Sequence, residues 1–177
     1  MKEADVAVSE MSMEIENPRF LPTYSECFVC GQGHPTGLRM RFFADPEGGV
    51  HAWFDPRPDQ TGYEDIVHGG VVSALLDELT GWTVTFKNRL MSFTAELKLR
   101  FVKPVTLGKR YLASARAAQG RGRLWEANGI IRDMEGTVYA KANGRYFLLT
   151  PEQTGVVAAR MTHQEGDDPI FKIGDKR

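Results

Sequence analysis

The chain has 177 residues, of which 42% are hydrophobic, which suits one globular domain with a sizeable core. Lysine and arginine total 22 against 23 aspartate and glutamate residues, and this balance argues against a broad nucleic-acid-binding surface. No apolar run is long enough to cross a bilayer, and the acidic first residues do not resemble a signal peptide, so we expect a soluble, cytoplasmic protein with no membrane partner.

The first segment, residues 1–26, has few large apolar side chains, and we expect a loose N-terminal arm. Cys27 and Cys30 follow with CxxC spacing, and His34 lies close behind them. A structural zinc ion needs four ligands, so His51 or a second chain would have to complete the set. A redox pair would have to begin a helix, which the glycines and proline after the cysteines disfavour. We therefore favour a loop over the core with reduced thiols and no metal.

Two short stretches predict a β-hairpin. Residues 38–44 (LRMRFFA) alternate apolar and basic side chains, which is typical of a half-buried strand. Residues 50–54 (VHAWF) form a second strand after the turn at residues 45–49, and residues 55–65 form a loop.

The most apolar stretch, residues 66–87, predicts a helix from about Gly70 to Phe86 that is buried on most sides. Asp77 lies within this apolar surface. Because burying an unpaired carboxylate costs several kcal/mol as an order of magnitude, Asp77 is a candidate functional residue. The residues that share its face are small or polar: Ser73, Thr80 and Gly81.

Four long strands joined by short turns are predicted after the helix, at residues 93–102, 110–118, 123–131 and 138–149. Alternation in the first of them places Leu97 and Leu99 on one face and Thr94 on the other. Residues 151–177 are charged and form a C-terminal tail. The order predicts an α+β fold in which an antiparallel sheet of about six strands wraps around one long central helix. Because such a sheet has unpaired edges, we expect a homo-oligomer that covers them.

Three stretches resemble the hotdog-fold acyl-CoA thioesterases of the PaaI-like group: CFVCGQGHPTGLRMRF (27–42), HGGVVSALLDE (68–78) and TAELKLRFVKPV (94–105). The resemblance covers residues 27–150. It implies a hotdog domain that forms a dimer or a tetramer, with active sites at the dimer interface.

The resemblance also implies roles for single residues. Asp77 corresponds to the catalytic carboxylate, the Gly70 N–H to the group that hydrogen-bonds the thioester carbonyl, and Thr94 to a residue that steadies the attacking water. Many members carry an asparagine where this chain has Gly62, and Gln60 is a nearby amide side chain.

Physical chemistry favours the same residues. The start of a helix offers unpaired N–H groups and a positive dipole end, and Gly69 and Gly70 let a substrate oxygen approach closely. His68 caps or shapes this turn. Asp77 lies on the order of 10 Å along the helix, so we expect the Asp77 of one subunit to face the glycine turn of its partner. The carboxylate acts either as general base on water or as nucleophile.

The turn after the second long strand carries Arg121 and Arg123, which are candidates to clamp the phosphates of coenzyme A. The expected function is hydrolysis of an acyl- or aryl-CoA to the free acid and CoA, with no cofactor beyond the CoA of the substrate. The alternatives are a non-catalytic acyl-CoA sensor or scaffold on the same fold and an acyl hydratase or dehydratase.

Overall fold

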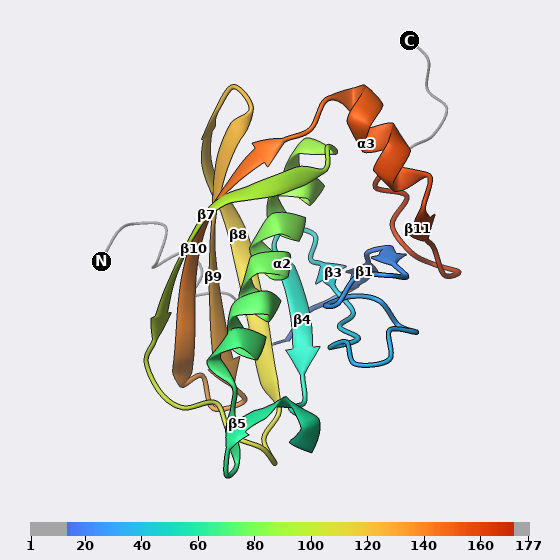
Figure 1. Cartoon of the computed structure of the whole chain (residues 1–177). Helices are drawn as coiled ribbons and strands as arrows, with labels where there is room; N and C mark the ends of the chain where they lie inside the picture. The colour runs from blue at the N-terminus through green and yellow to red at the C-terminus, as the bar shows by residue number, and fades with distance from the viewer. Residues whose placement is uncertain (1–13, 172–177) are drawn as a thin grey trace.

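The computed structural model describes residues 14–171 and shows one antiparallel sheet that curves around a long helix (Figure 1). The helix is α2 (Gly69–Asn88), which confirms the expected central helix. The sheet runs in the order β1 (Arg19–Phe20), β3 (Phe43–Ala44), β4 (Val50–Phe54), β8 (Tyr111–Arg121), β9 (Leu124–Asp133), β10 (Val138–Leu148) and β7 (Ser92–Phe101). The six predicted strands are all present, and the seventh is β1.

The smaller elements lie around this sheet. They are β2 (Thr23–Tyr24), η1 (Pro58–Gln60), β5 (Thr61–Tyr63), β6 (Ile66–Val67), α3 (Pro151–Ala158) and β11 (Met161–Thr162). The expected N-terminal arm and C-terminal tail meet, because β2 pairs with β11. The described part of the arm, residues 14–26, thus joins both the sheet and the tail, whereas residues 1–13 and 172–177 lie outside the described residues.

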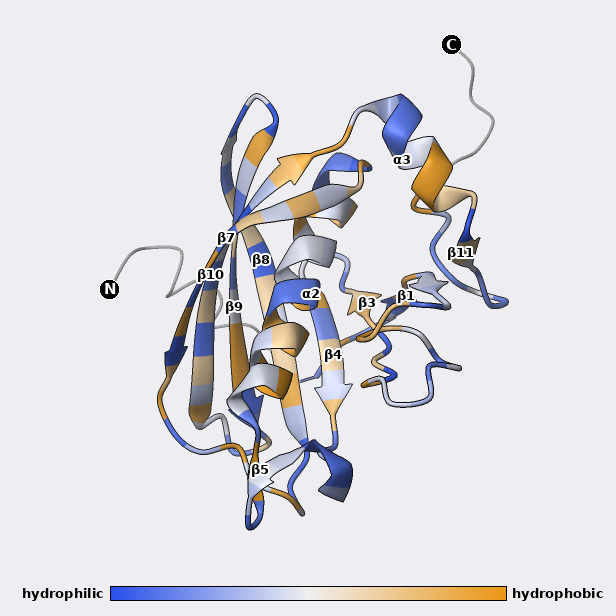
Figure 2. Ribbon diagram, viewed as in Figure 1, coloured by the Kyte–Doolittle hydropathy of each residue, from blue (hydrophilic) through white to orange (hydrophobic). Residues whose placement is uncertain are grey.

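The core forms where α2 faces the sheet. Leu75, Leu76 and Leu79 of α2 are completely buried. Ala113 and Ala115 of β8 are also completely buried, and such small side chains let the helix approach the sheet closely. Figure 2 shows bands of hydrophobic colour on α2 and the long strands, and hydrophilic colour in η1. The core therefore holds α2, and with it Asp77, at a fixed height above the sheet.

The strand predicted over residues 38–44 is limited to Phe43–Ala44. The alternation itself is present, since Leu38, Met40 and Phe42 are buried. However, the N–H groups of Leu38 and Met40 donate to the carbonyl oxygens of Phe28 and Val29. The neighbour of this stretch is thus the cysteine-containing loop, which lies over the core as expected.

Thr94 faces α2, and the strict alternation predicted for β7 is wrong at this position. The register between β10 and β7 shifts, so that Arg145 pairs with Glu96 but Tyr146 pairs with Thr94. Ala95 is the extra residue of a β-bulge. Because of this bulge, the side chains before Ala95 point to the opposite face of the sheet from the one that strict alternation predicts. The bulge turns the Thr94 hydroxyl towards the helix.

β7 forms one edge of the seven-stranded sheet, and its large apolar side chains are poorly covered: Phe93 is 66% exposed and Phe101 is 54% exposed. β7 pairs with β10 on one side only, and its ten residues are long enough to pair with another chain at the other edge. None of the described helices is long and apolar enough to cross a membrane.

Candidate active site

The Asp77 carboxylate is held through one of its two oxygens. The Thr94 hydroxyl of β7 donates to Oδ1 at 2.9 Å, and the Tyr146 hydroxyl of β10 lies 3.0 Å from the same atom. Within the described residues Oδ2 makes no hydrogen bond. The structure thus brings together Asp77 and Thr94 as predicted and leaves one carboxylate oxygen available to a substrate or a water molecule.

Tyr146 is a residue of this site that the sequence analysis missed. It is 1% exposed, and its hydroxyl also lies 2.6 Å from the Thr80 hydroxyl. Burial, the largest cause, and the neighbouring Asp77 carboxylate raise the pKa of Tyr146 well above its usual value, so its hydroxyl stays protonated. The available signal was the row of small residues before it on the same strand, Ala140, Ala142 and Gly144, which leaves room for one large ring.

The glycine turn lies at the start of α2. The Nδ1 atom of His68 accepts a hydrogen bond from the Gly70 N–H at 2.9 Å, so His68 caps the helix as expected. The Gly70 N–H, predicted to bind the thioester carbonyl, is therefore already in use. The Gly69 N–H has no hydrogen-bond acceptor within the described part of the chain. Within the described residues this turn thus offers one N–H group that is free and one that donates to His68.

Asp77 and the glycine turn do not meet within one chain. Seven residues of one continuous helix separate Asp77 from Gly70, a rise of about 10 Å. Asp77 lines one cavity and Gly69 lines another, and the two cavities share no residue. A single chain thus carries the two halves of the predicted site in separate places.

Gln60 is buried at the end of η1, where its side-chain oxygen accepts a hydrogen bond from the Arg57 N–H. Its backbone oxygen accepts the His68 N–H, which places Gln60 beside the glycine turn. The Gln60 Nε2 atom is buried without a hydrogen-bond partner in the described chain. A buried amide donor of this kind is suited to an oxygen ligand that enters the turn.

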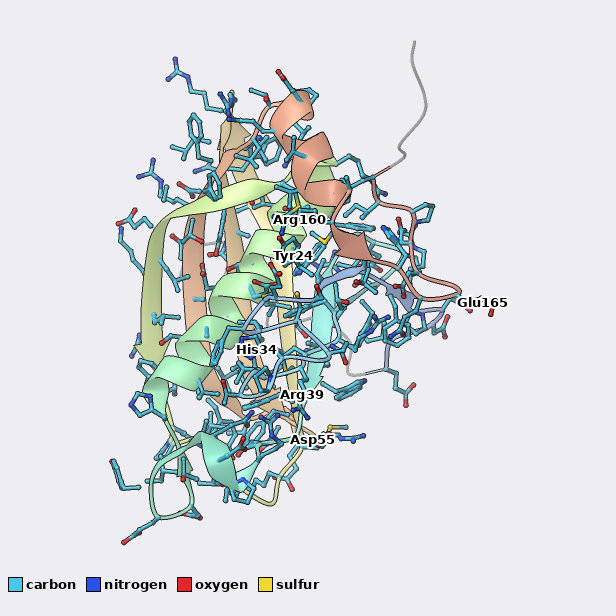
Figure 3. The ribbon with its side chains drawn as sticks, turned by 45° about the vertical axis from the view of Figure 1, so that its right-hand side comes forward. Tyr24, His34, Arg39, Asp55, Arg160 and Glu165 are labelled. Atoms are coloured by element: carbon cyan, nitrogen blue, oxygen red, sulfur yellow. The ribbon has the colours of Figure 1, made fainter. Side chains whose placement is uncertain are left out.

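Asp77 lines a cavity of about 390 Å³ between α2, the N-terminal segment and the tail. Trp82, Met91 and Met161 contribute apolar walls. Tyr24 and Arg160 lie at its outer side, with the guanidinium carbon 5.6 Å from the ring centroid, and they lie side by side in Figure 3. The cavity can therefore hold an apolar group beside the free oxygen of Asp77.

The same cavity contains an unexpected acidic cluster, formed by Cys27, Cys30 and Glu78. Burial, the largest cause, and the nearby Cys27 thiolate raise the pKa of Glu78 to about 8. Hydrogen bonds from the Cys30 thiol and from the N–H groups of Cys30 and Val29 lower the pKa of Cys27 to about 5. The Cys30 thiol forms a hydrogen bond with the Cys27 thiolate. This hydrogen bond, the largest cause, and burial raise the pKa of Cys30. Glu78, which adjoins Asp77 in the chain, is thus part of the same cavity wall.

Residues 64–140 match the family model of the Thioesterase superfamily. This stretch runs from the glycine turn through α2 to β10, and so includes Asp77 and Thr94. The match covers 77 of the 177 residues, and the chain as a whole has the hotdog fold.

Several solved structures share this fold. The thioesterase superfamily protein RHA08564 is 19% identical with a TM-score of 0.65, over 81% of this chain and 70% of that one. The PaaI protein of Escherichia coli is 15% identical with a TM-score of 0.59, over 64% and 81% of the two chains. A hypothetical thioesterase of Streptococcus pneumoniae TIGR4, solved with coenzyme A, is 20% identical with a TM-score of 0.54, over 58% and 79%.

An uncharacterized protein of Schizosaccharomyces pombe is 29% identical to this chain over 119 residues. The alignment covers 63% of this chain and 66% of the yeast protein, so the chain matches just under two thirds of that relative's length.

The two arginines expected to clamp phosphates lie at the β8–β9 turn, and neither lines one of the two cavities. Arg121 is exposed. The Arg123 Nε atom donates to the Leu148 carbonyl oxygen at 2.8 Å, and its guanidinium stacks on Phe147. Of the two, Arg121 has the side chain that is free to reach an anion.

Proposed function

We propose that this protein is a homo-oligomeric thioesterase that hydrolyses an acyl- or aryl-CoA to the free acid and CoA. The observation that carries the proposal is the Asp77 carboxylate: two hydroxyl groups hold one of its oxygens, while the other makes no hydrogen bond to the described residues and lies in an apolar cavity. A carboxylate oriented in this way suits a general base or a nucleophile better than a structural acid. The coenzyme A in the Streptococcus pneumoniae relative supports CoA as the carrier.

In this proposal the thioester carbonyl binds at the glycine turn of the partner subunit. The Gly69 N–H donates to the carbonyl oxygen, and the Gly70 N–H exchanges its bond to His68 for a second donation. The exposed edge of β7 supports a two-fold dimer, since pairing of two β7 strands would cover Phe93 and Phe101 and place the helices side by side. Arg121 then contributes to binding the CoA phosphates, and Gln60 supports the turn.

Two routes lead from this arrangement to hydrolysis. In one, Asp77 takes a proton from water while the water oxygen attacks the carbonyl carbon and the CoA thiolate leaves. In the other, an Asp77 oxygen attacks the carbon itself, the thiolate leaves, and water then cleaves the mixed anhydride. Both routes need the carboxylate and release the same products.

The first experiment measures hydrolysis of a panel of acyl- and aryl-CoAs by the wild-type protein and by Asp77→Asn, which keeps the size of the side chain. We expect turnover by the wild type and a fall of about 1,000-fold or more in the variant, because its amide can act neither as a base nor as an effective nucleophile. Glu135→Gln, in an exposed turn, is the matched control and should keep full activity. Tight CoA binding without turnover of any thioester would instead favour a non-catalytic acyl-CoA sensor.

A further inference from the structure

The CxxC pair and Glu78 form one compact set of potential metal ligands. The sulfur atoms of Cys27 and Cys30 and a carboxylate oxygen of Glu78 all lie within 4.8 Å of one another. The Cys27 Sγ atom is 3.5 Å from Glu78 Oε1. Zinc binds thiolate sulfur at about 2.3 Å and carboxylate oxygen at about 2.0–2.2 Å, so tetrahedral geometry separates two such ligand atoms by about 3.5 Å. The Cys27–Glu78 pair thus already has the spacing of two zinc ligands, and the Cys30 sulfur lies within 4.8 Å of both atoms.

The loop holds the sulfur atoms in place through its backbone. The Cys27 Sγ atom accepts hydrogen bonds from the N–H groups of Val29 and Cys30, and the Cys30 Sγ atom accepts one from Tyr24. Gly31 closes the turn, since a Cβ atom there would lie 2.5 Å from the Cys27 carbonyl oxygen. Backbone donors to sulfur stabilise thiolates and orient them, which is the role of supporting groups around a metal.

A bound cation would also balance the charge of the cluster when all three groups are ionised. In the described part of the chain, no lysine or arginine forms a hydrogen bond or an ion pair with Cys27, Cys30 or Glu78. The Glu78 carboxylate accepts only neutral donors, including the Trp82 indole N–H at 3.2 Å. Three acidic groups that face one another are stable as anions only if a positive charge lies between them.

We propose that Cys27, Cys30 and Glu78 bind one Zn²⁺ ion. Two thiolates and one carboxylate suit zinc, and three protein ligands leave a fourth position for water or a substrate oxygen. All three residues line the cavity that contains Asp77, so the fourth ligand can enter from that cavity. The ion would fasten the cysteine-containing loop to α2 one residue from Asp77.

This assignment differs from the ligand set considered from the sequence. The His51 ring is completely buried and lies 3.0 Å from both Asp45 and Ser114, so it is already bonded elsewhere. His34 packs its ring edge-on against Phe28 and is not part of the cluster. Glu78 takes the place of the histidines.

The test is a titration of the reduced, metal-free full-length chain with Co²⁺, which reports thiolate ligation through sulfur-to-cobalt charge-transfer absorption. We expect saturation at one ion per chain and release of the cobalt by added Zn²⁺. Cys27→Ser and Glu78→Gln should each weaken binding by about 100-fold or more, since loss even of a residue that only supports a ligand typically costs 10- to 100-fold. The control Asp77→Asn should bind as the wild type does, because Asp77 is outside the ligand set.

A second readout uses the wild-type chain alone, in case a variant fails to fold. Zn²⁺ should raise the unfolding temperature and protect both thiols from a thiol reagent. The absence of charge-transfer absorption in the folded, reduced protein would overturn the proposal. Binding that survives in Glu78→Gln would overturn the assignment of Glu78. Because these readouts do not involve hydrolysis, they stand or fall independently of the thioesterase proposal.

Discussion

The two hydroxyl groups on Asp77 come from different strands and orient the same carboxylate oxygen. Thr94 reaches it because of the bulge in β7, and Tyr146 reaches it from the buried face of β10. Because two donors fix Oδ1, the carboxylate group cannot rotate freely. Oδ2 is therefore held in one orientation at the wall of the cavity. Tyr146 is therefore a positioning residue for Asp77.

Tyr146→Phe tests this role, because it removes one hydroxyl and keeps the ring. We expect hydrolysis to fall by about 10-fold or more, since a hydrogen bond to a charged group contributes about 1.5–3 kcal/mol. The matched control is Tyr139→Phe, which removes a hydroxyl that donates to Asp133 at 3.0 Å, away from the cavity. Steady-state rates with the best CoA thioester provide the measurement. Equal losses in the two variants would show a general effect on stability rather than on Asp77.

Single residues of the site differed in how well they could be predicted. Asp77 could be predicted, because a carboxylate within an apolar helix is costly wherever that helix packs. Tyr146 could not, because a tyrosine on a strand is ordinary until the structure shows which residue its hydroxyl meets. The position of Glu78 beside the cysteines could not be predicted for a related reason: only the folded loop brings the cysteines to its side of α2.

At the scale of elements, β10 combines a large ring with the glycine that makes room for it. Gly144 and Tyr146 face the same way, and a Cβ atom at Gly144 would overlap the Tyr146 ring and lie 2.6 Å from its hydroxyl oxygen. Gly81 on α2 also touches this ring, where an added Cβ would lie 3.3 Å from it. The tyrosine thus fits between strand and helix because both elements carry glycine there.

Gly144→Ala should therefore destabilise the protein by about 1–3 kcal/mol, as overpacking of a core does, and should displace Tyr146 from Asp77. Gly155→Ala is the control: Gly155 lies in α3 with nothing within 4 Å of an added Cβ, and alanine there should stabilise the helix by about 0.5–1 kcal/mol. Denaturant midpoints compare the two, with hydrolysis rates measured alongside. An unchanged midpoint for Gly144→Ala would mean that the ring can move at no cost.

The elements themselves were largely predictable, because apolar periodicity separates one 20-residue helix from strands joined by short turns. Two features depend on contacts between distant segments and were not. One is the bulge at Ala95, which local alternation does not reveal, and the other is the pairing of β2 with β11. The stretch at residues 38–44 kept its alternation but lost most of its strand, because the cysteine-containing loop takes the hydrogen bonds.

At the scale of the whole molecule, one helix carries both halves of the proposed site. Asp77 lies in the middle of α2, and the glycine turn lies at its start, in a different cavity. A rigid helix cannot bring the two together, whereas a two-fold axis beside β7 makes two helices antiparallel neighbours. The proposed active site then exists only between subunits, and the chain should show no activity as a monomer.

Mixing two inactive variants tests this arrangement directly. Asp77→Asn removes the carboxylate, and Gly70→Pro removes a donor at the second helical residue, a position in the first turn where proline is tolerated. If the sites form between subunits, a heterodimer of the two variants contains one site with both defects and one site with neither. Heterodimers purified through two different affinity tags should thus regain about half of the wild-type activity, while each variant alone stays inactive. If the carboxylate and the turn of one chain served the same site, the mixture would remain inactive. The same variants carrying a single tag, and thus purified as homodimers, supply the baseline.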